Sequence, residues 1–166
     1  MKIIFLTSIL IIFGFTQEIA PQFYLPTLDE NHFFASEVYG AKAEAPTVTV
    51  ISFFASWCAP CQKEIKALDS LSVKFPDIAF YLVNYKEKKD IVKKWISKMQ
   101  TDIPILLDNY GLVSKKFKVA ITDENGKLNI NLPTIFVINK KGEIIYSHTG
   151  YDDKDAKILS NLLENL

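Results

Sequence analysis

A strand pattern, a closely spaced pair of cysteines and a helix pattern follow one another directly between residues 47 and 75. Residues 47–54, TVTVISFF, are almost all β-branched or aromatic, which favours a central strand covered on both faces. The stretch SWCAPC comes next and holds both cysteines of the chain, Cys58 and Cys61. The helical stripe that follows consists of Ile65, Leu68, Leu71 and Phe75. The two cysteines are therefore predicted to lie at a strand-to-helix turn.

Strand and helix patterns also alternate through the rest of the chain. Two short strands around residues 29–31 predict an N-terminal hairpin, and Asn125-Gly126 between alternating apolar residues predicts a second one. Further strands are expected at 78–83, 105–107, 134–138 and 143–147, and helices at 87–99, 110–117 and from about residue 153. The apolar residues of the last two long helices, Ile91, Val92, Trp95, Ile96 and Met99, then Ile158, Leu159, Leu162, Leu163 and Leu166, are expected to form single core-facing stripes. Together these patterns predict an α/β fold with helices on both sides of the sheet.

The first 20 residues have the pattern of a targeting segment. Lys2 precedes an apolar run from residue 3 to residue 15, which as a helix would extend only about 20 Å and is short for a membrane span. We expect a secretory signal peptide or an N-terminal membrane anchor at 1–20, with one domain at 21–166. The protein is accordingly predicted to be exported to a periplasmic or other extracytoplasmic space.

The charge composition excludes several kinds of partner. Nineteen lysines balance nineteen acidic residues, so no basic surface for nucleic acid is expected, and the membrane is expected to be contacted only through the N-terminal segment. The chain has no arginine, which removes bidentate guanidinium clamps and also the arginine that the peroxide site of a peroxiredoxin requires. Nothing in the sequence calls for a cofactor.

A pair of cysteines separated by two residues is compatible with three kinds of chemistry. It can be a redox pair, half of a zinc site, or two inert core residues. A zinc site would need about four ligands, and only His32 and His148 remain as ligands of the usual kind. Inert thiols fit an exported protein poorly because an oxidising space would pair them. The position directly before a helix favours reversible dithiol-disulfide exchange.

The helix start gives the two cysteines different roles. Unpaired amide groups at the first turn of a helix stabilise an adjacent thiolate, so we expect Cys58 to be the attacking sulfur. Pro60 suits the first turn because its missing N–H costs nothing there. Cys61, one turn further on, is expected to be more buried and to resolve the mixed disulfide.

Several motifs together resemble the thioredoxin superfamily. The stretches VISFFASWCAPC, LPT before a strand, and GEIIYSHTGY look like its exported TlpA/ResA/CcmG branch, over about residue 23 to the C-terminus. The stretch VNYKEKKDIVKKWI further resembles the CcmG-type members, which reduce the haem-binding thiols of apocytochrome c. The resemblance implies a thioredoxin fold with a central mixed sheet flanked by helices. It also implies protein disulfide substrates and a membrane thiol reductant as electron donor.

Three further site residues follow from this resemblance. Pro133 matches the cis-proline that faces the dithiol and pairs with a bound substrate backbone, the alternative being a trans proline that opens an edge strand. Trp57 would cover the active site, or pack as a large ring. Glu64 matches an acidic position that can take the proton that Cys61 must lose, but as a charge in the first helical turn it can also be simply solvated.

The chain departs from the family pattern at two places. Ser52 stands where thioredoxins carry a buried aspartate, and a serine cannot serve as a base at neutral pH, so proton handling would need Glu64 or water. The segment VAITDENGKLNIN inserts a hairpin before the cis-proline, which either narrows the choice of partner or is a surface elaboration.

The function predicted from the sequence is that of an exported thiol-disulfide oxidoreductase that works as a reductant. The pair Ala59-Pro60 lacks the histidine found between the cysteines of strongly oxidising relatives, which favours the reducing direction. The alternative is a partner-binding module in which the Cys58–Cys61 disulfide is only structural.

Overall fold

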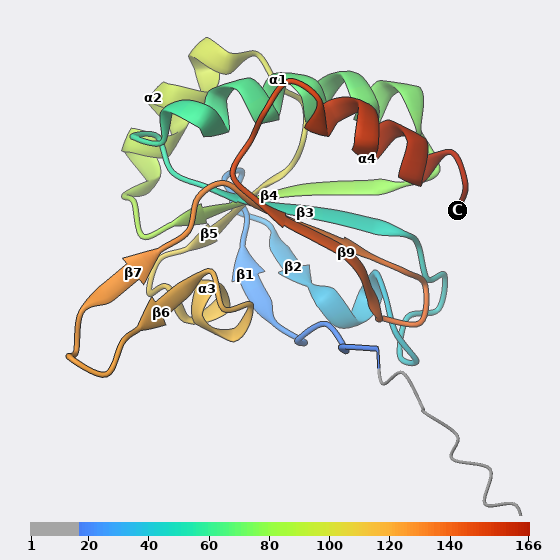
Figure 1. Ribbon diagram of the computed structural model, residues 1–166, viewed down its shortest axis with the longest axis horizontal. Coiled ribbons are helices and arrows are strands. Elements are labelled where there is room, and N and C mark those ends of the chain that lie inside the picture. The colour runs from blue at the N-terminus through green and yellow to red at the C-terminus, as the bar shows by residue number, and fades with distance from the viewer. Residues whose placement is uncertain (1–16) are drawn as a thin grey trace, which may run out of the picture.

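The computed structural model describes residues 17–166, and a five-stranded mixed sheet lies at its centre (Figure 1). The strand order is β5-β4-β3-β8-β9, in which β3, β4 and β5 are parallel and β8 and β9 are antiparallel to their neighbours. The strands are β3 (Thr49–Phe54), β4 (Ala79–Tyr85), β5 (Ile105–Asp108), β8 (Thr134–Ile138) and β9 (Ile144–Thr149). Every residue of β3 is buried, as the unbroken apolar run predicts.

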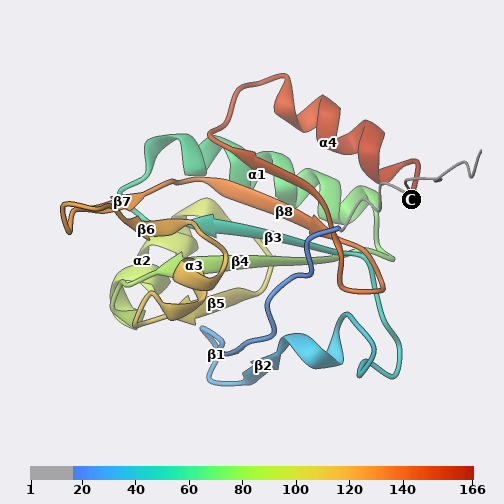
Figure 2. The same ribbon diagram turned by 60° about the horizontal axis from the view of Figure 1, so that its bottom comes forward.

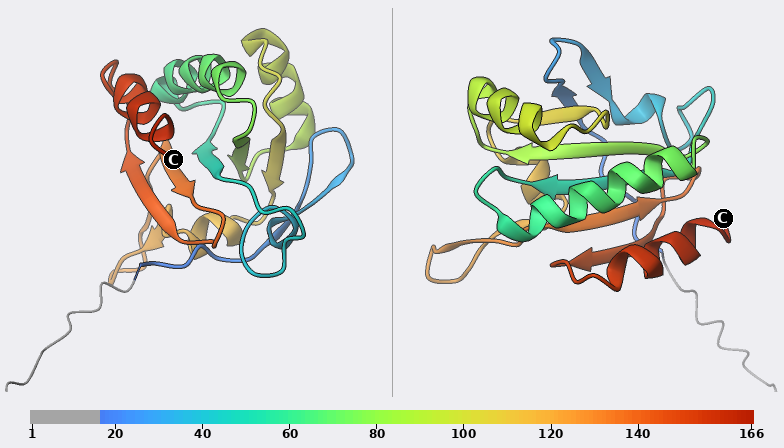
Figure 3. Two further views of the ribbon diagram at one scale, coloured as in Figure 1. Left: turned by 90° about the vertical axis from the view of Figure 1, so that its right-hand side faces the viewer. Right: turned by 90° about the horizontal axis from the view of Figure 1, so that it is seen from above.

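Three helices cover one face of this sheet, and smaller elements cover the other (Figures 1 and 3). The first face carries α1 (Ala59–Lys74), α2 (Lys89–Met99) and α4 (Asp155–Leu163), and the second carries α3 (Leu112–Lys116), a 3-10 turn at Ala35–Glu37 and the N-terminal hairpin. Alternate residues of β3 supply both layers: Val50 and Phe54 pack under α1, while Ile51 and Phe53 pack on the opposite side. The predicted α/β thioredoxin-type architecture is confirmed.

Both predicted hairpins are present. The N-terminal hairpin pairs β1 (Tyr24–Pro26) with β2 (His32–Phe34), and the amide of Leu28 bonds it to the edge strand β5 at 2.9 Å. The inserted hairpin pairs β6 (Ala120–Thr122) with β7 (Leu128–Ile130) and turns through Gly126, whose φ of +78° favours glycine. It projects from the body of the molecule (Figures 1 and 2).

The predicted stripes on the second and fourth helices are only partly buried. Val92 and Leu159 are buried, but Ile91 and Ile158 are 49% and 46% exposed, and Leu166 lies beyond the end of α4. The prediction that each stripe faces the core throughout is wrong at these three positions. Both helices lie near the margins of the sheet (Figure 3), where a helix has packing neighbours on fewer sides than at the centre.

The predicted signal or anchor at 1–20 lies outside the described residues except for its last four positions. Between residues 17 and 166, no helix has both the length and the apolar character that crossing a membrane requires.

Candidate active site

The dithiol lies at the first turn of α1, where the sequence predicts it. Cys58 is the N-cap residue in an extended conformation, and its Sγ accepts a hydrogen bond from the amide of Cys61 at 3.3 Å. Pro60 occupies the first turn of the helix, where its missing N–H leaves no partner unsatisfied. The amide end of α1 therefore points at the sulfur of Cys58, and a negative charge on that sulfur would be stabilised there.

The two cysteines are bonded to each other and differ in exposure. Their Sγ atoms form a disulfide, with the Cα atoms 5.3 Å apart. Cys58 is 5% exposed while Cys61 has no exposed surface, so of the two residues only Cys58 has surface that an incoming partner can contact. In residues 17–166, no group of three or more His, Cys, Asp and Glu side chains is arranged to hold a metal ion.

Pro133 lies at the same end of the sheet as the dithiol. Because β8 runs antiparallel to β3, with Phe53 opposite Thr134, the start of β8 lies beside the end of the strand that leads to Cys58. The Leu132–Pro133 peptide bond is cis, and the Pro133 carbonyl accepts the amide of Gly150 at 2.8 Å. Leu132 packs against the core cluster that contains both cysteines. The loop before β8 thus lies at the end of the sheet where β3 leads to the dithiol.

Trp57 precedes the dithiol and is 62% exposed. Its ring is therefore not part of the core, and the prediction that it covers the active site stays a prediction. A large exposed aromatic ring directly beside Cys58 is instead placed where an incoming chain would meet it.

Glu64 is buried rather than solvated. It is 3% exposed, and its Oε2 accepts a hydrogen bond from the Ser52 hydroxyl at 2.6 Å. Burial raises the pKa of Glu64 from its ordinary value of 4.5 to about 7; the bond from Ser52 acts in the opposite direction, and the charge of Asp155 raises it further. Glu64 is three residues after Cys61 and therefore shares its face of the helix. A carboxyl group that titrates near neutral pH is thus held one turn from the buried sulfur.

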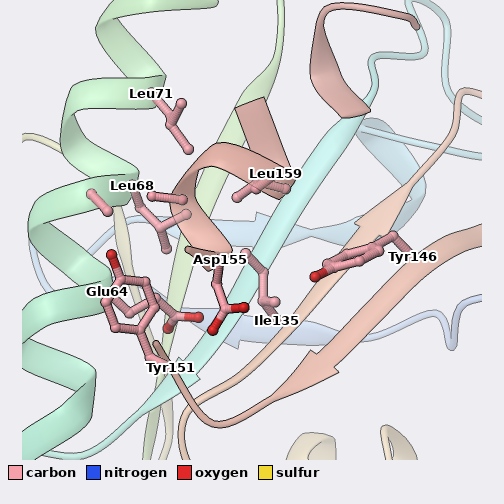
Figure 4. A pocket seen from close by; sticks show the side chains of 10 residues that line it. Glu64, Leu68, Leu71, Ile135, Tyr146, Tyr151, Asp155 and Leu159 are labelled. Atoms are coloured by element: carbon pink, nitrogen blue, oxygen red, sulfur yellow. The ribbon is translucent and has the colours of Figure 1, made fainter. Parts of the chain in front are cut away.

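The carboxyl group of Glu64 faces a small cavity between α1, α4 and β9 (Figure 4). The polar side chains in its wall are Glu64, Tyr146, Tyr151 and Asp155, and the remaining lining is apolar. Sequence analysis did not connect Asp155 with the dithiol, because the contact depends on how α4 docks onto the sheet.

Glu87 is a second acidic residue that sequence analysis missed. Its carboxylate accepts hydrogen bonds from the amide of Ser56 at 2.7 Å, from the Ser56 hydroxyl, and from the amide side chain of Asn84 at 2.7 Å. These bonds tie the loop before Cys58 to the end of β4. Glu87 therefore holds the loop that leads to the dithiol in place. No local sequence pattern indicates this role.

Replacing Glu87 by alanine is expected to lower the free energy of unfolding by about 2 kcal/mol, because partly buried donors lose a charged acceptor. Urea denaturation measures the change. Glu124→Ala, at an exposed position in the inserted hairpin, is the matched control and is expected to cost less than about 0.5 kcal/mol. Equal effects of the two substitutions would show that Glu87 does not hold the loop.

Comparison with known proteins agrees with this geometry. The sequence profile of the AhpC/TSA family matches residues 16–147, which is most of the chain. The chain belongs to the AhpC/TSA family. Among its relatives in this family is the sporulation thiol-disulfide oxidoreductase A of Bacillus subtilis (strain 168), which is 31% identical over 101 residues. That match takes in 58% of this chain and 55% of the relative, so the chain spans little more than half of the relative's length.

Two further proteins are similar to this chain over most of its length. The thiol-disulfide oxidoreductase ResA of Geobacillus kaustophilus (strain HTA426) is 27% identical over 138 residues, which are 82% of this chain and 70% of ResA. A solved thiol-disulfide oxidoreductase from Bacteroides fragilis NCTC 9343 superposes with a TM-score of 0.69 at 20% identity, over 90% of this chain and all of that one. The structural likeness shows the thioredoxin-like fold, and the named relatives confirm the resemblance to the TlpA/ResA/CcmG branch.

Proposed function

We propose that this protein is a thiol-disulfide oxidoreductase that reduces disulfides in other exported proteins. The observation that carries the proposal is the arrangement of the pair: Cys58 caps the amide end of a helix and keeps a small exposed fraction of 5%, and its bonded partner Cys61 is fully buried. The relatives named as thiol-disulfide oxidoreductases support the same chemistry.

The first half of the reaction belongs to Cys58. In the reduced protein its thiolate attacks one sulfur of the substrate disulfide, so that a mixed disulfide forms and the other substrate sulfur leaves as a thiolate. The amide groups at the start of α1 stabilise the attacking anion. Trp57 and the loop at Leu132-Pro133 border the position of the substrate chain.

The second half belongs to Cys61. Its thiol gives a proton to the Glu64 carboxylate and attacks the Cys58 sulfur, which breaks the mixed disulfide and releases the second substrate thiolate. Two electrons have then passed from the protein to the substrate, and the protein is left with the Cys58–Cys61 disulfide. Ser52 holds the Glu64 carboxylate in place through the 2.6 Å hydrogen bond.

The reducing direction requires a donor that delivers electrons on the outer side of the membrane. We infer a membrane thiol reductant that restores the dithiol, and substrates that include apocytochrome c. Both come from the resemblance to the TlpA/ResA/CcmG branch. The sequence between the cysteines, Ala59-Pro60, is compatible with a reductant.

A trapping experiment tests the proposal. Without Cys61 the mixed disulfide at Cys58 cannot be resolved, so a Cys61→Ala variant expressed in the native host is expected to accumulate covalent complexes that mass spectrometry can identify. Apocytochrome c in the trap would support a role in cytochrome maturation, and many unrelated proteins would support a general reductant. An empty trap would contradict catalysis, with a Cys58→Ser, Cys61→Ala double variant as the control.

A partner-binding module with a structural disulfide is the second candidate. It is favoured by the exposed apolar residues Ile121 and Leu128 on the inserted hairpin and by the burial of both cysteines. Under this alternative the Cys58–Cys61 bond resists dithiothreitol and the protein does not accelerate insulin reduction. The oxidoreductase is expected to do the opposite in both assays.

A further inference from the structure

The carboxyl groups of Glu64 and Asp155 face one small cavity. Its volume is about 10 Å³, close to the room that a single water molecule needs. Glu64 comes from α1 and Asp155 from the start of α4, and their side chains point toward the same space (Figure 4). Tyr146 and Tyr151 complete the polar part of the wall.

Asp155 connects this cavity with the surface. It is 8% exposed, and its Oδ2 accepts the amide of Asp152 at 2.5 Å and lies 3.3 Å from Nε2 of His148. The His148 side chain is 41% exposed, so its ring reaches solvent. Glu64 and Asp155 therefore line one cavity, and Asp155 lies beside His148, so the three side chains lead from the buried end of the dithiol site to the outside.

We propose that Asp155 and His148 form the outlet through which Glu64 exchanges its proton with solvent. The proposal rests on the proposed function, because Glu64 needs an outlet only if it receives the proton of Cys61. Asp155 and His148 are positioning residues, since they act on the reaction through Glu64. They contact neither the substrate nor the sulfur atoms.

The proton balance of this path is simple. Glu64 takes one proton when Cys61 becomes a thiolate, and it must lose that proton before the next cycle. In this proposal the proton passes from Glu64 across the cavity to the carboxylate of Asp155, then to the imidazole of His148 and to solvent. Imidazole suits the last step because one ring nitrogen can accept a proton while the other donates one.

Several titratable side chains face Asp155 from the elements packed against it. Asp155 is faced by Glu64 from α1, by Tyr146 and His148 from β9, and by Tyr151 and Asp152 from the loop before α4. Burial raises the pKa of both tyrosines, so their hydroxyl groups stay protonated and add no charge. Two carboxyl groups at one cavity repel each other when both are charged, and the charge of Asp155 is one of the causes that raise the pKa of Glu64.

Rescue by a diffusible base separates a proton outlet from a structural role. The reduced protein is mixed with oxidised glutathione at low buffer concentration, and tryptophan fluorescence follows oxidation. The rate that no longer rises with glutathione concentration reports attack by Cys61. At pH 6 most Glu64 carboxyl groups start protonated and must lose a proton before they can accept that of Cys61. His148→Ala is expected to lower this rate about tenfold at pH 6, and added imidazole is expected to restore it to within about twofold of the wild-type rate. An unchanged rate, or a lowered rate that imidazole does not restore, would overturn the proposal.

A matched pair of charge variants gives a second test. Asp155→Asn is expected to shift the midpoint of the Glu64 carboxyl titration, followed by carbon NMR, to lower pH, because a like charge is removed. Asp153→Asn removes the same charge from an exposed neighbour and is expected to leave this midpoint unchanged. Equal shifts, or no shift in Asp155→Asn, would overturn the coupling. If Asp155→Asn does not fold, imidazole rescue of His148→Ala, a variant at an exposed position, still tests the proposed outlet.

These results can be told apart from failure of the proposed function. If the wild-type protein does not react with oxidised glutathione, the oxidoreductase proposal fails and the outlet fails with it. If the wild-type protein reacts and the variants behave like it, only the outlet is overturned.

Discussion

Replacing Cys58 by serine is expected to reduce the rate of insulin disulfide reduction to the rate measured without the protein. Serine keeps the size of the side chain but supplies a hydroxyl group, which does not ionise at neutral pH and does not attack a disulfide. Cys61 cannot take over the reaction because its surface is fully buried. The turbidity of precipitating insulin in the presence of dithiothreitol measures the rate.

The control for this loss is a test of folding. Cys58→Ser leaves the first turn of α1 with a good N-cap residue, since serine accepts the same amide hydrogen bond that the sulfur accepts now. Circular dichroism of the variant is therefore expected to match that of the reduced wild-type protein. Insulin reduction that persists in a folded Cys58→Ser protein would contradict the assignment of the attacking sulfur.

Replacing Glu64 by glutamine is expected to remove a large pH dependence of stability. Burial raises the pKa of Glu64 to about 7, whereas the unfolded chain titrates at about 4.5, so between these values the folded protein holds a proton that the unfolded chain releases. The stability from the neutral buried carboxyl group is fully present below pH 4.5 and is lost as pH rises through 7. The shift corresponds to about 3 kcal/mol.

Urea denaturation of the oxidised protein between pH 4.5 and 8 measures this effect. The free energy of unfolding of the wild-type protein is expected to fall by about 3 kcal/mol relative to Glu64→Gln over this range. Glu44→Gln, at an exposed position, is expected to follow the wild-type curve. Parallel curves for wild type and Glu64→Gln would show that Glu64 is ionised in the folded protein throughout.

Local sequence patterns were sufficient for the secondary structure and for the position of the dithiol. The apolar run 47–54, the proline inside the cysteine pair and the Asn125-Gly126 turn each act over a few residues, and each lies in the predicted element. The edges of the helical stripes were harder to predict, because exposure of Ile91 and Ile158 depends on how far the sheet extends beneath α2 and α4.

The helical spacing of Glu64 predicts that it is buried, but a charged side chain is usually expected to be exposed. Glu64 lies three residues after Cys61 and four before Leu68, on the same helical stripe as the core residues of α1. Ser52 lies between Val50 and Phe54 on the face of β3 that α1 covers, so its hydroxyl group meets this carboxyl group. The thioredoxin pattern puts a carboxylate on the strand, and here the carboxylate comes from the helix while the strand supplies a serine.

The contacts of Asp155 and Glu87 could not be predicted from local patterns. Asp155 and Glu64 line the same cavity although 91 positions separate them in the sequence. Glu87 accepts a hydrogen bond from Ser56, which lies 31 positions earlier. Both contacts depend on the docking of a helix or loop against the sheet. Such contacts become visible only once the fold is known.

The central claim is that Cys58 ionises readily to a thiolate in the reduced protein. The most direct test measures how the rate of alkylation by iodoacetamide depends on pH. Only the thiolate reacts, and the buried Cys61 is expected to react slowly, so the midpoint of the curve reports the ionisation of Cys58. We predict a midpoint well below about 8.5, the usual value for a free cysteine. A midpoint at or above that value would contradict the account, because the helix would then give the sulfur no help in becoming an anion.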